Sequence, residues 1–414
     1  MRRSSGALAA LVLVAGLVTA GCGSHGGAAT PAEAAVDLST LDVGPYKAEP
    51  GTWDKPRNTA QAIAMEAERL GNVVPLPSDI DPAFQYIGAQ NSLVLTDDIK
   101  GSVISDFWKD DHFAEDGPGY AGGFATYARD DAHNNGTELL NAVLIFGTPD
   151  QAAAAATAYQ ARAFAAPATD GLGDTPDPAQ PANEVVPIAK YPGAHAHWRP
   201  GQQAIFSWFA FRNFVVFTSV YGQDAIALHH ADRAVLIDLV THSLDAESAA
   251  LQNYNSTPPD KLTDQPMDPD GMLNRTLERP KAATGEWVNP PGVYNARAAL
   301  NFTDDQKGDK VWFERDGVDR FSDYGTRLYR TRDAAAALDA RDELGGGSKH
   351  FKPSEAPKNL PAAICREYRG KELGTIRYYC AVNYGRYAAM SWSDQLLDAQ
   401  QRISAQYAIL VKAK

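Results

Sequence analysis

The segment LLNAVLIFGTPDQAAAAATAYQARAFAA, at residues 139–166, decides the fold class. Its first eight residues are almost all apolar and predict a buried strand. The remainder predicts a helix, because Thr148 is a good N-cap, Pro149 suits the first helical position, and Gln151 completes a capping box. A strand that leads directly into an alanine-rich helix is therefore the first predicted pair of elements.

The residues that follow predict the neighbours of this strand. Three apolar segments read as strands, around 194–199, 203–211 and 213–221. A helix is predicted at 231–244, where leucines and a valine recur at helical spacing on one stripe. Before the first pair, Asn58 is predicted to cap another helix, which ends at Gly71.

The second half of the chain repeats this order. Thr326–Arg330 reads as a strand, and Thr331-Arg332-Asp333 begins a second alanine-rich helix. Three more strands are predicted near 363–369, 375–383 and 386–392. Ser393 then caps a helix that runs to the C-terminus. Each half reads strand, helix, three strands, helix. This order predicts the α+β class: two tandem domains, each an antiparallel sheet with helices packed on one face.

Length and composition agree with globular domains. The 414 residues are 44% hydrophobic and 21% charged, and the formal net charge is −13. A nucleic-acid partner is not expected, because a protein that tracks phosphates needs a basic face. We place the N-terminal domain at 41–254 and the C-terminal domain at 293–414. A linker rich in Pro, Asp and Gly joins them at 255–292.

The N-terminus predicts the address of the protein. Two arginines precede an apolar stretch at 6–20, which is too short to span a membrane comfortably. Small residues then lead to Cys22, and this order resembles the lipobox of bacterial lipoproteins, although Thr19 stands where leucine is commoner. The alternative is an ordinary secretory signal with a chance cysteine.

The resemblance to a lipobox implies a defined processing and location. Residues 1–21 would be a signal peptide, Cys22 would carry a diacylglyceryl thioether, and 22–40 would form a flexible tether. Stable anchoring requires more than one acyl chain. We therefore expect the protein on the extracytoplasmic face of the cell membrane, held by its lipid.

Longer stretches extend the resemblance over the mature chain. They are LDVGPYKAEP (41–50), AERLGNVVPLPSDIDP (67–82), LTDQPMDPDGMLNR (262–275) and YYCAVNYGRYAAMSWSDQLLDAQQRISAQYAIL (378–410). These resemble a family of two-domain envelope lipoproteins of mycobacteria, nocardiae and their actinobacterial relatives, whose function is unknown. The resemblance implies an N-terminal and a C-terminal domain, and it carries over no catalytic residue.

Two cysteines in the second half predict a disulfide. The segments that hold Cys365 and Cys380 would fold back on each other through residues 370–374, which places the two cysteines directly opposite. Paired positions in an antiparallel ladder have Cα atoms within disulfide range, and the compartment outside the membrane is oxidising. The alternative is two reduced thiols in the core.

Histidines offer the only pattern that suggests a metal site. His195 and His197 are predicted to point to the same face of a strand, but two ligands are too few. His229 and His230 could supply a third, yet adjacent residues of an extended segment point to opposite sides. We favour a polar strand face near the surface edge of the sheet. No catalytic residue, metal or cofactor is predicted.

Two short motifs resemble known binding loops and are rejected. The glycines of 117–122 match a dinucleotide fingerprint, but no apolar strand precedes them, so we predict a loop that enters a helix. The turn at 268–271 resembles a calcium loop, but Pro266 and Leu277 stand where acidic residues are needed, so a turn in the linker is favoured. Weak calcium binding by Asp264, Asp268 and Asp270 is the alternative.

Aromatic residues crowd the strands of both halves. Sheet core is the favoured interpretation, and an aromatic-lined cleft for a glycan or lipid is the alternative. We expect a non-enzymatic module that binds a partner protein, glycan or lipid in the cell envelope. The alternatives are a hydrolase of envelope polymers and an extracytoplasmic sensor or accessory subunit.

Overall fold

The computed structural model describes residues 36–87, 92–97, 99–107, 112–133, 135–171, 175–280, 289–347, 349–371 and 376–413. Cys22 lies outside the described residues, as do the expected signal peptide at 1–21 and positions 22–35 of the expected tether. None of the helices in the described ranges has the length and hydrophobicity needed to cross a bilayer.

The first sheet is antiparallel and has seven strands in the order β1-β2-β3-β7-β6-β5-β4. The strands are β1 (Val94–Leu95), β2 (Tyr120–Arg129), β3 (Thr137–Phe146), β4 (Glu184–Val185), β5 (His195–Arg199), β6 (Ala204–Phe211) and β7 (Phe214–Gly222). The strand predicted at 139–146 is β3, and it lies in the interior of the sheet between β2 and β7. Its apolar run is explained by this position, because a central strand is buried on both faces.

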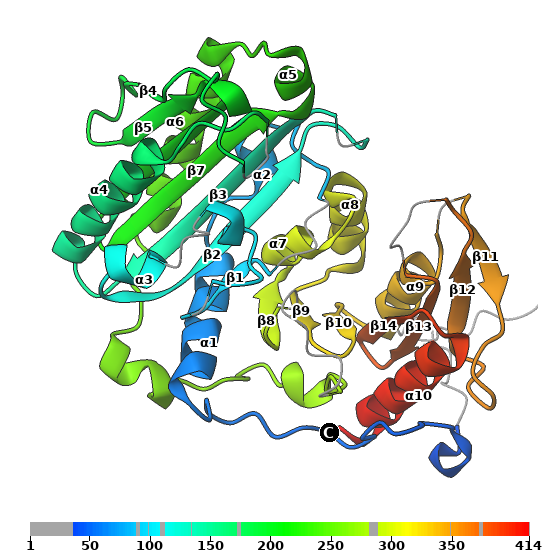
Figure 1. Cartoon of the computed structure of the whole chain (residues 1–414). Helices are drawn as coiled ribbons and strands as arrows, with labels where there is room; N and C mark the ends of the chain where they lie inside the picture. The colour runs from blue at the N-terminus through cyan, green and yellow to red at the C-terminus, as the bar shows by residue number, and fades with distance from the viewer. Residues whose placement is uncertain are drawn as a thin grey trace, which may run out of the picture. The chain divides into compact units, whose positions relative to one another are not determined.

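Helices cover both faces of this sheet (Figure 1). They are α1 (Thr59–Gly71), α2 (Pro77–Ile80), α3 (Phe113–Asp116), α4 (Pro149–Ala165), α5 (Gln223–Leu228) and α6 (Arg233–Leu251). Leu140 and Leu144 of β3 pack with the alanines of α4, whereas Leu139 and Val143 share a hydrophobic cluster with α1 and α6. The α+β class is confirmed. The expectation that helices pack on one face only is corrected: alternate apolar residues of β3 point to opposite faces of the sheet, so helices are needed on both faces to bury them.

The second sheet has the same topology as the first. Its order is β8-β9-β10-β14-β13-β12-β11, again antiparallel throughout. The strands are β8 (Gly292–Asn295), β9 (Arg320–Asp323), β10 (Arg327–Arg330), β11 (Phe351–Ser354), β12 (Ile364–Tyr368), β13 (Tyr378–Tyr384) and β14 (Tyr387–Ser393). The internal repeat is therefore confirmed, and it includes three strands in each half beyond the predicted four.

The helices of the second half follow the same plan. They are α7 (Ala296–Ala299), α8 (Gln306–Asp316), α9 (Ala334–Leu344) and α10 (Leu396–Lys412). Ala340 of α9 shares a cluster with Ala388 of β14, whereas Ile403 of α10 shares another with the adjacent Ala389. Neighbouring residues of one strand point to opposite faces, so α9 and α10 cover opposite faces, as α4 and α6 do in the first half.

The helix caps confirm some predicted side-chain roles and correct others. Asn58 and Thr148 are the predicted N-caps, and their side chains accept backbone hydrogen bonds. Asp333, predicted only to stand at the start of its helix, is also an N-cap. Gln151 does not complete a capping box, since its Oε1 has no hydrogen-bond partner. Ser393 is not the cap of α10, because the helix begins three residues later, at Leu396, and Gln395 is in the N-cap position. The backbone N–H of Gln395 donates to the Ser393 hydroxyl.

Cys365 of β12 and Cys380 of β13 form the predicted disulfide. They are directly opposite in the ladder, with Cα atoms 4.1 Å apart. Both side chains are buried in the cluster beneath α10.

The first described residues pack against the last helix of the chain. Asp42 accepts hydrogen bonds of 3.0 Å from Gln401, and Lys412 donates to the Ala48 carbonyl at 2.8 Å. Residues 41–48, which the sequence placed at the start of the N-terminal domain, therefore lie beside α10 (Figure 1).

Candidate functional site

A pocket of about 550 Å³ is the candidate binding site. Three segments line it: Leu76, Ser78, Asp79, Pro82 and Gln85; then Ala296, Arg297 and Leu300; and finally Gln306, Lys307, Lys310, Phe313, Glu314, Gly317 and Val318. A volume between roughly 300 and 1,000 Å³ is typical of small-molecule sites. The first segment belongs to α2 and the turn after it, and the others to α7 and α8.

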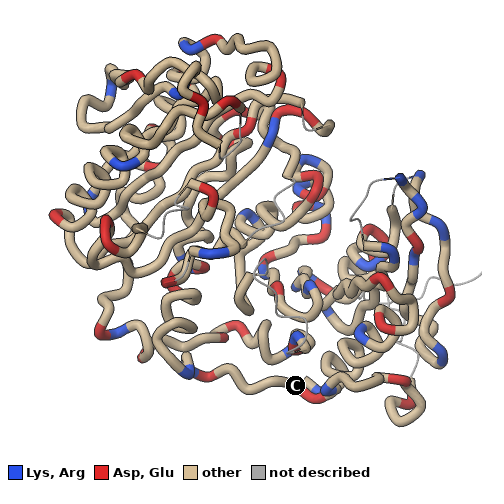
Figure 2. The backbone as a smooth tube through the Cα atoms, in the orientation of Figure 1, with Lys and Arg blue, Asp and Glu red and all other residues tan. Residues whose placement is uncertain are grey.

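One face of α8 forms a wall of this pocket. The lining positions 306, 307, 310, 313 and 314 recur at helical spacing, so they lie on a single face. The helix is set by its ends: Asp305 accepts a hydrogen bond from the Gly308 N–H, and Gly317 closes the helix at a φ of 61°. Charges of both signs occur along α8 (Figure 2).

The floor of the pocket is apolar. Leu76, Leu300, Phe313 and Val318 are buried members of the largest hydrophobic cluster, which contains residues of both sheets. An apolar body placed on this floor would extend an existing core, and its transfer from water would be favourable by about 25 cal/mol per Å² of apolar surface.

Arg297 holds the first wall against the second. Its guanidinium donates to the Val74 carbonyl at 2.8 Å and to the Asp79 carboxylate at 2.6 Å. The same Asp79 oxygen accepts a hydrogen bond from the Leu76 N–H. Asn295 adds two hydrogen bonds to Asn72, of 2.6 and 3.1 Å. The pocket walls are therefore fixed by polar contacts between segments that are far apart in sequence.

Gln306 leaves an open donor at the pocket. Its side chain is only 3% exposed, and its Oε1 accepts a 2.9 Å hydrogen bond from the Ser78 hydroxyl. Its Nε2 has no hydrogen-bond partner in the described structure. Buried polar atoms are nearly always hydrogen-bonded, so an open N–H beside a pocket indicates a place for an acceptor.

Glu247 is a buried carboxyl group near this site. It lies on α6, is fully buried, and neither oxygen has a hydrogen-bond partner in the described structure. Burial raises the pKa of Glu247 to about 8, and the charge of Arg297 opposes this rise.

The two histidines of β5 differ in their exposure to solvent. His195 is exposed, with Nε2 3.4 Å from the Thr157 hydroxyl, whereas His197 is fully buried, with its ring stacked on Trp208. Burial, with the charge of Arg199, lowers the pKa of His197 to about 3. The expected position near a surface edge is wrong for His197, because its ring packs against Phe164 of α4 and against Phe206 and Trp208 of β6. Among the described residues, no three His, Cys, Asp or Glu side chains converge as metal ligands.

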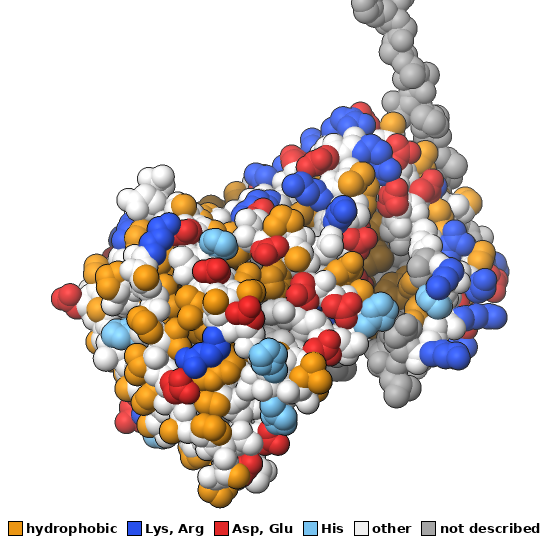
Figure 3. Space-filling view, turned by 90° about the horizontal axis from the view of Figure 1, so that it is seen from above, with side chains coloured by type: hydrophobic (Ala, Val, Ile, Leu, Met, Phe, Trp, Pro, Cys, Tyr) orange, Lys and Arg blue, Asp and Glu red, His pale blue; other side chains and the backbone are white. Residues whose placement is uncertain are grey.

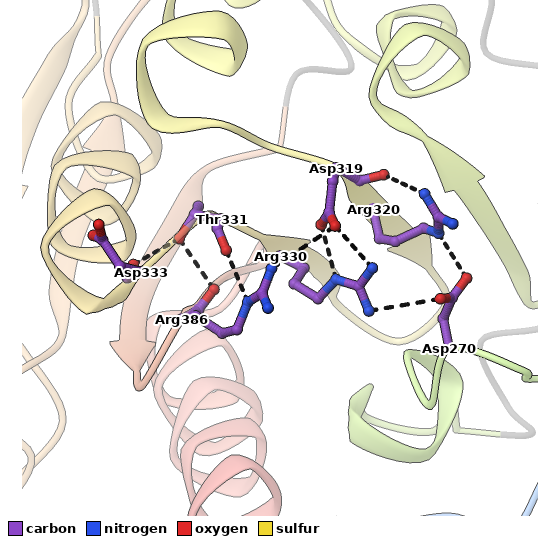
Figure 4. A network of polar contacts seen from close by, with 7 residues as sticks. All are labelled: Asp270, Asp319, Arg320, Arg330, Thr331, Asp333 and Arg386. Atoms are coloured by element: carbon purple, nitrogen blue, oxygen red, sulfur yellow. Dashed lines mark hydrogen bonds and ion pairs between the residues drawn. The ribbon is translucent and has the colours of Figure 1, made fainter.

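The rejected motifs have structural roles. The glycine-rich stretch at 117–122 enters strand β2 and not the predicted helix, because residues 120–129 find a long partner in β3. Asp270, from the turn that resembles a calcium loop, instead accepts a hydrogen bond of 2.6 Å from Arg320 and lies 3.6 Å from Arg330 (Figure 4).

Asp319 is the centre of this Arg–Asp network. It accepts two hydrogen bonds from Arg330, of 2.8 and 2.9 Å, and its carboxylate lies 3.8 Å from Arg386. Desolvation alone would raise the pKa of Asp319. Its hydrogen bonds with Arg330 and the charges of the surrounding arginines outweigh this effect, so the pKa lies below its usual value. The network joins β9, β10 and the turn between β13 and β14 (Figure 4).

We expect Asp319→Ala to lower the free energy of unfolding by about 1–2 kcal/mol, since it removes two charge-assisted hydrogen bonds from a half-exposed site. Chemical denaturation measures this change. Asp260→Ala is the control, because Asp260 makes only an exposed 3.6 Å ion pair with Lys261. Equal effects of the two substitutions would contradict the central role of Asp319.

The aromatic strands form core. Phe206, Trp208 and Phe217 lie in the buried cluster beneath α4, and Phe313 is the one aromatic residue that lines the pocket described above. The favoured interpretation as sheet core is thus confirmed for these residues.

Sequence reasoning missed the pocket residues of α8. The helix has no apolar stripe that periodicity could detect, since most of its residues are charged or polar. The sequence signals that could have located α8 are at its two ends. Asp305 is a favourable N-cap residue, and Gly317, twelve residues later, is a favourable residue for the C-terminal end of a helix.

Two family models match the chain. The model described as the N-terminal part of DUF7373, a domain of unknown function, covers residues 53–267, and that of its C-terminal part covers 272–413. Comparison with curated proteins gives no significant match. Among solved structures, the extracellular domain of PknH from Mycobacterium tuberculosis is similar at 12% identity, covering 45% of this chain and 97% of that chain, with a TM-score of 0.28.

Proposed function

This chain belongs to the DUF7373 family, whose N-terminal and C-terminal parts it contains in order, and we propose that it is an envelope lipoprotein that binds a small, partly apolar molecule outside the cell membrane. The family description names no function, so the proposal rests on the pocket and on the sequence. The pocket beside α8 is the observation that carries the binding function. It combines an apolar floor with polar groups at its walls, which is the usual composition of a small-molecule site.

The location is supported by two features of the sequence and structure. A buried disulfide persists in oxidising compartments and is rare in the cytosol. Cys22 stands at a lipobox-like site, and the wider sequence resembles mycobacterial and nocardial lipoproteins. Attachment through the lipid of Cys22 would place the pocket in the cell envelope.

Cys22→Ser tests the anchor. We expect the variant to appear in the medium and not in the membrane fraction, or to accumulate as uncut precursor. The reason is that the lipid on Cys22 is proposed to attach the protein to the bilayer. Fractionation of cells followed by immunoblotting measures this. A variant that fractionates and migrates like wild type would show that Cys22 is not lipidated.

A neutral fluorescent probe tests the pocket. N-phenyl-1-naphthylamine should bind to the mature chain without its lipidated cysteine, residues 23–414, of which Ala35–Lys414 form one compact unit. Ala296→Trp should abolish binding, because the indole would fill the pocket that Ala296 lines. Val311→Trp is the matched control, since Val311 is 64% exposed on α8 and does not line the pocket. Equal binding by both variants would reject the pocket as the site.

A further inference from the structure

We infer that the ligand of this pocket is a single-chain amphiphile with an anionic head, a carboxylate at the end of a hydrocarbon chain. This inference rests on the proposed function, because it names the ligand class of the same site. The observations that support it are the charged side chains at the pocket walls and the side-chain N–H group of Gln306, which has no hydrogen-bond partner in the described structure.

The pocket has more cationic than anionic side chains. Arg297, Lys307 and Lys310 line it, against Asp79 and Glu314. Arg297 and Asp79 already pair at 2.6 Å, so their charges compensate each other. Of the remaining charged lining residues, two are lysines of α8 and only one, Glu314, is acidic. Neither lysine forms an ion pair with any described residue. The lining therefore has an excess of one positive charge, in a chain whose net charge is −13.

On the face shown in Figure 3, acidic and basic side chains are interspersed with hydrophobic ones. The pocket lining places two lysines that form no ion pair with any described residue beside a buried apolar floor. An anionic head on an apolar tail would satisfy both features.

Gln306 supplies the specific contact for the head. Its Nε2 is a buried donor without a partner, and its Oε1 is already held by Ser78. A carboxylate oxygen can accept from this N–H and from the Lys310 ammonium, one helical turn away on the same face of α8. Hydrogen bonds to ionised groups are stronger than those between neutral groups.

Two acidic residues near the start of α8, Asp305 and Asp309, have other partners. Asp305 accepts the Gly308 N–H at 2.9 Å, and Asp309 accepts the indole N–H of Trp312 at 2.8 Å. Because Asp305 caps the helix, we assign recognition to the side chains of Gln306, Lys307 and Lys310 and not to the helix terminus.

Ligand comparison on residues 23–414 tests the head group. Binding of hexadecanoate, below its micelle concentration and at low salt, should be about tenfold tighter than binding of hexadecanol, as expected for one charge-assisted contact. The double variant Lys307→Gln/Lys310→Gln should reduce this preference to less than about threefold, and Gln306→Leu should weaken hexadecanoate alone. Lys352→Gln/Lys358→Gln, on and after the outer strand β11, is the charge-matched control and should keep the preference.

Each other outcome has a defined meaning. Equal binding of the acid and the alcohol would overturn the anionic head, while the proposed pocket would stand if the neutral probe still bound. Competition by acetate at the same concentration as hexadecanoate would show that a free anion suffices and would overturn the amphiphile. Loss of binding of the neutral probe, the acid and the alcohol together would reject the proposed function itself.

Discussion

Glu247→Gln is expected to remove a fall in stability that the wild-type chain shows as the pH rises from about 4.5 to about 8. The side chain is fully buried on α6, and neither of its oxygens has a hydrogen-bond partner in the described structure. Burial raises the pKa of Glu247 from its usual 4.5 to about 8, because a charged carboxylate loses its hydration there.

The direction of the pH effect follows from proton binding. Between these two pKa values the unfolded chain has lost the Glu247 proton, whereas the folded chain retains it. Unfolding therefore releases a proton, and the free energy of unfolding decreases by about 1.4 kcal/mol per pH unit in this window. Below about pH 4.5 both states are protonated, and the effect of this group disappears.

Denaturation of wild type and variants from pH 4 to pH 9 measures this slope. Glutamine has nearly the same shape and stays neutral, so Glu247→Gln should differ from wild type increasingly as the pH rises. Asp238→Asn is a control on the exposed side of the same helix and should leave the slope unchanged. Parallel curves for wild type and Glu247→Gln would show that this carboxyl does not titrate as described.

The second large effect is expected from the disulfide. Cys365→Ala/Cys380→Ala should lower the free energy of unfolding by about 3 kcal/mol, because the bridge closes a loop with a sequence separation of 15 in the unfolded chain. Alanine is preferred to serine, since both positions are buried and a hydroxyl there would need a partner.

Denaturant titration with and without a reductant measures the disulfide effect. Reductant should bring wild type close to the double variant and leave the double variant unchanged. A wild type that loses no stability on reduction, while free thiols are detected, would contradict the predicted contribution. Because both cysteines lie beneath α10, the loss should be accompanied by faster hydrogen exchange in that helix.

The repeat was predictable because its central elements carry strong local signals. Seven of the ten residues of β3 are apolar, and α4 and α9 begin at clear N-caps. The outer strands β1, β4, β8 and β11 have only two to four residues, which is too short for alternation to be seen. The burial of His197 was missed because its ring packs against Phe164 of α4, a contact that the strand pattern alone does not indicate.

The pocket could not be predicted because its walls meet only in the folded chain. Ser78 and Gln306 are 228 residues apart in sequence, and nothing in either local pattern indicates their contact. The stretch that ends in LPSDIDP was recognised by resemblance alone, and its place opposite α8 depends on the packing of α7 and Asn295 against Asn72. By contrast, the disulfide lay within one hairpin and followed from its register.

The contacts of residues 41–48 bear on the order in which the chain folds. Lys412 of α10 donates to the Ala48 carbonyl across a sequence separation of 364 residues. This contact forms only after α10 has been synthesised, so the segment 41–48 waits for its partner while the two sheets between them are made. Its docking beside α10 is therefore a late step of folding.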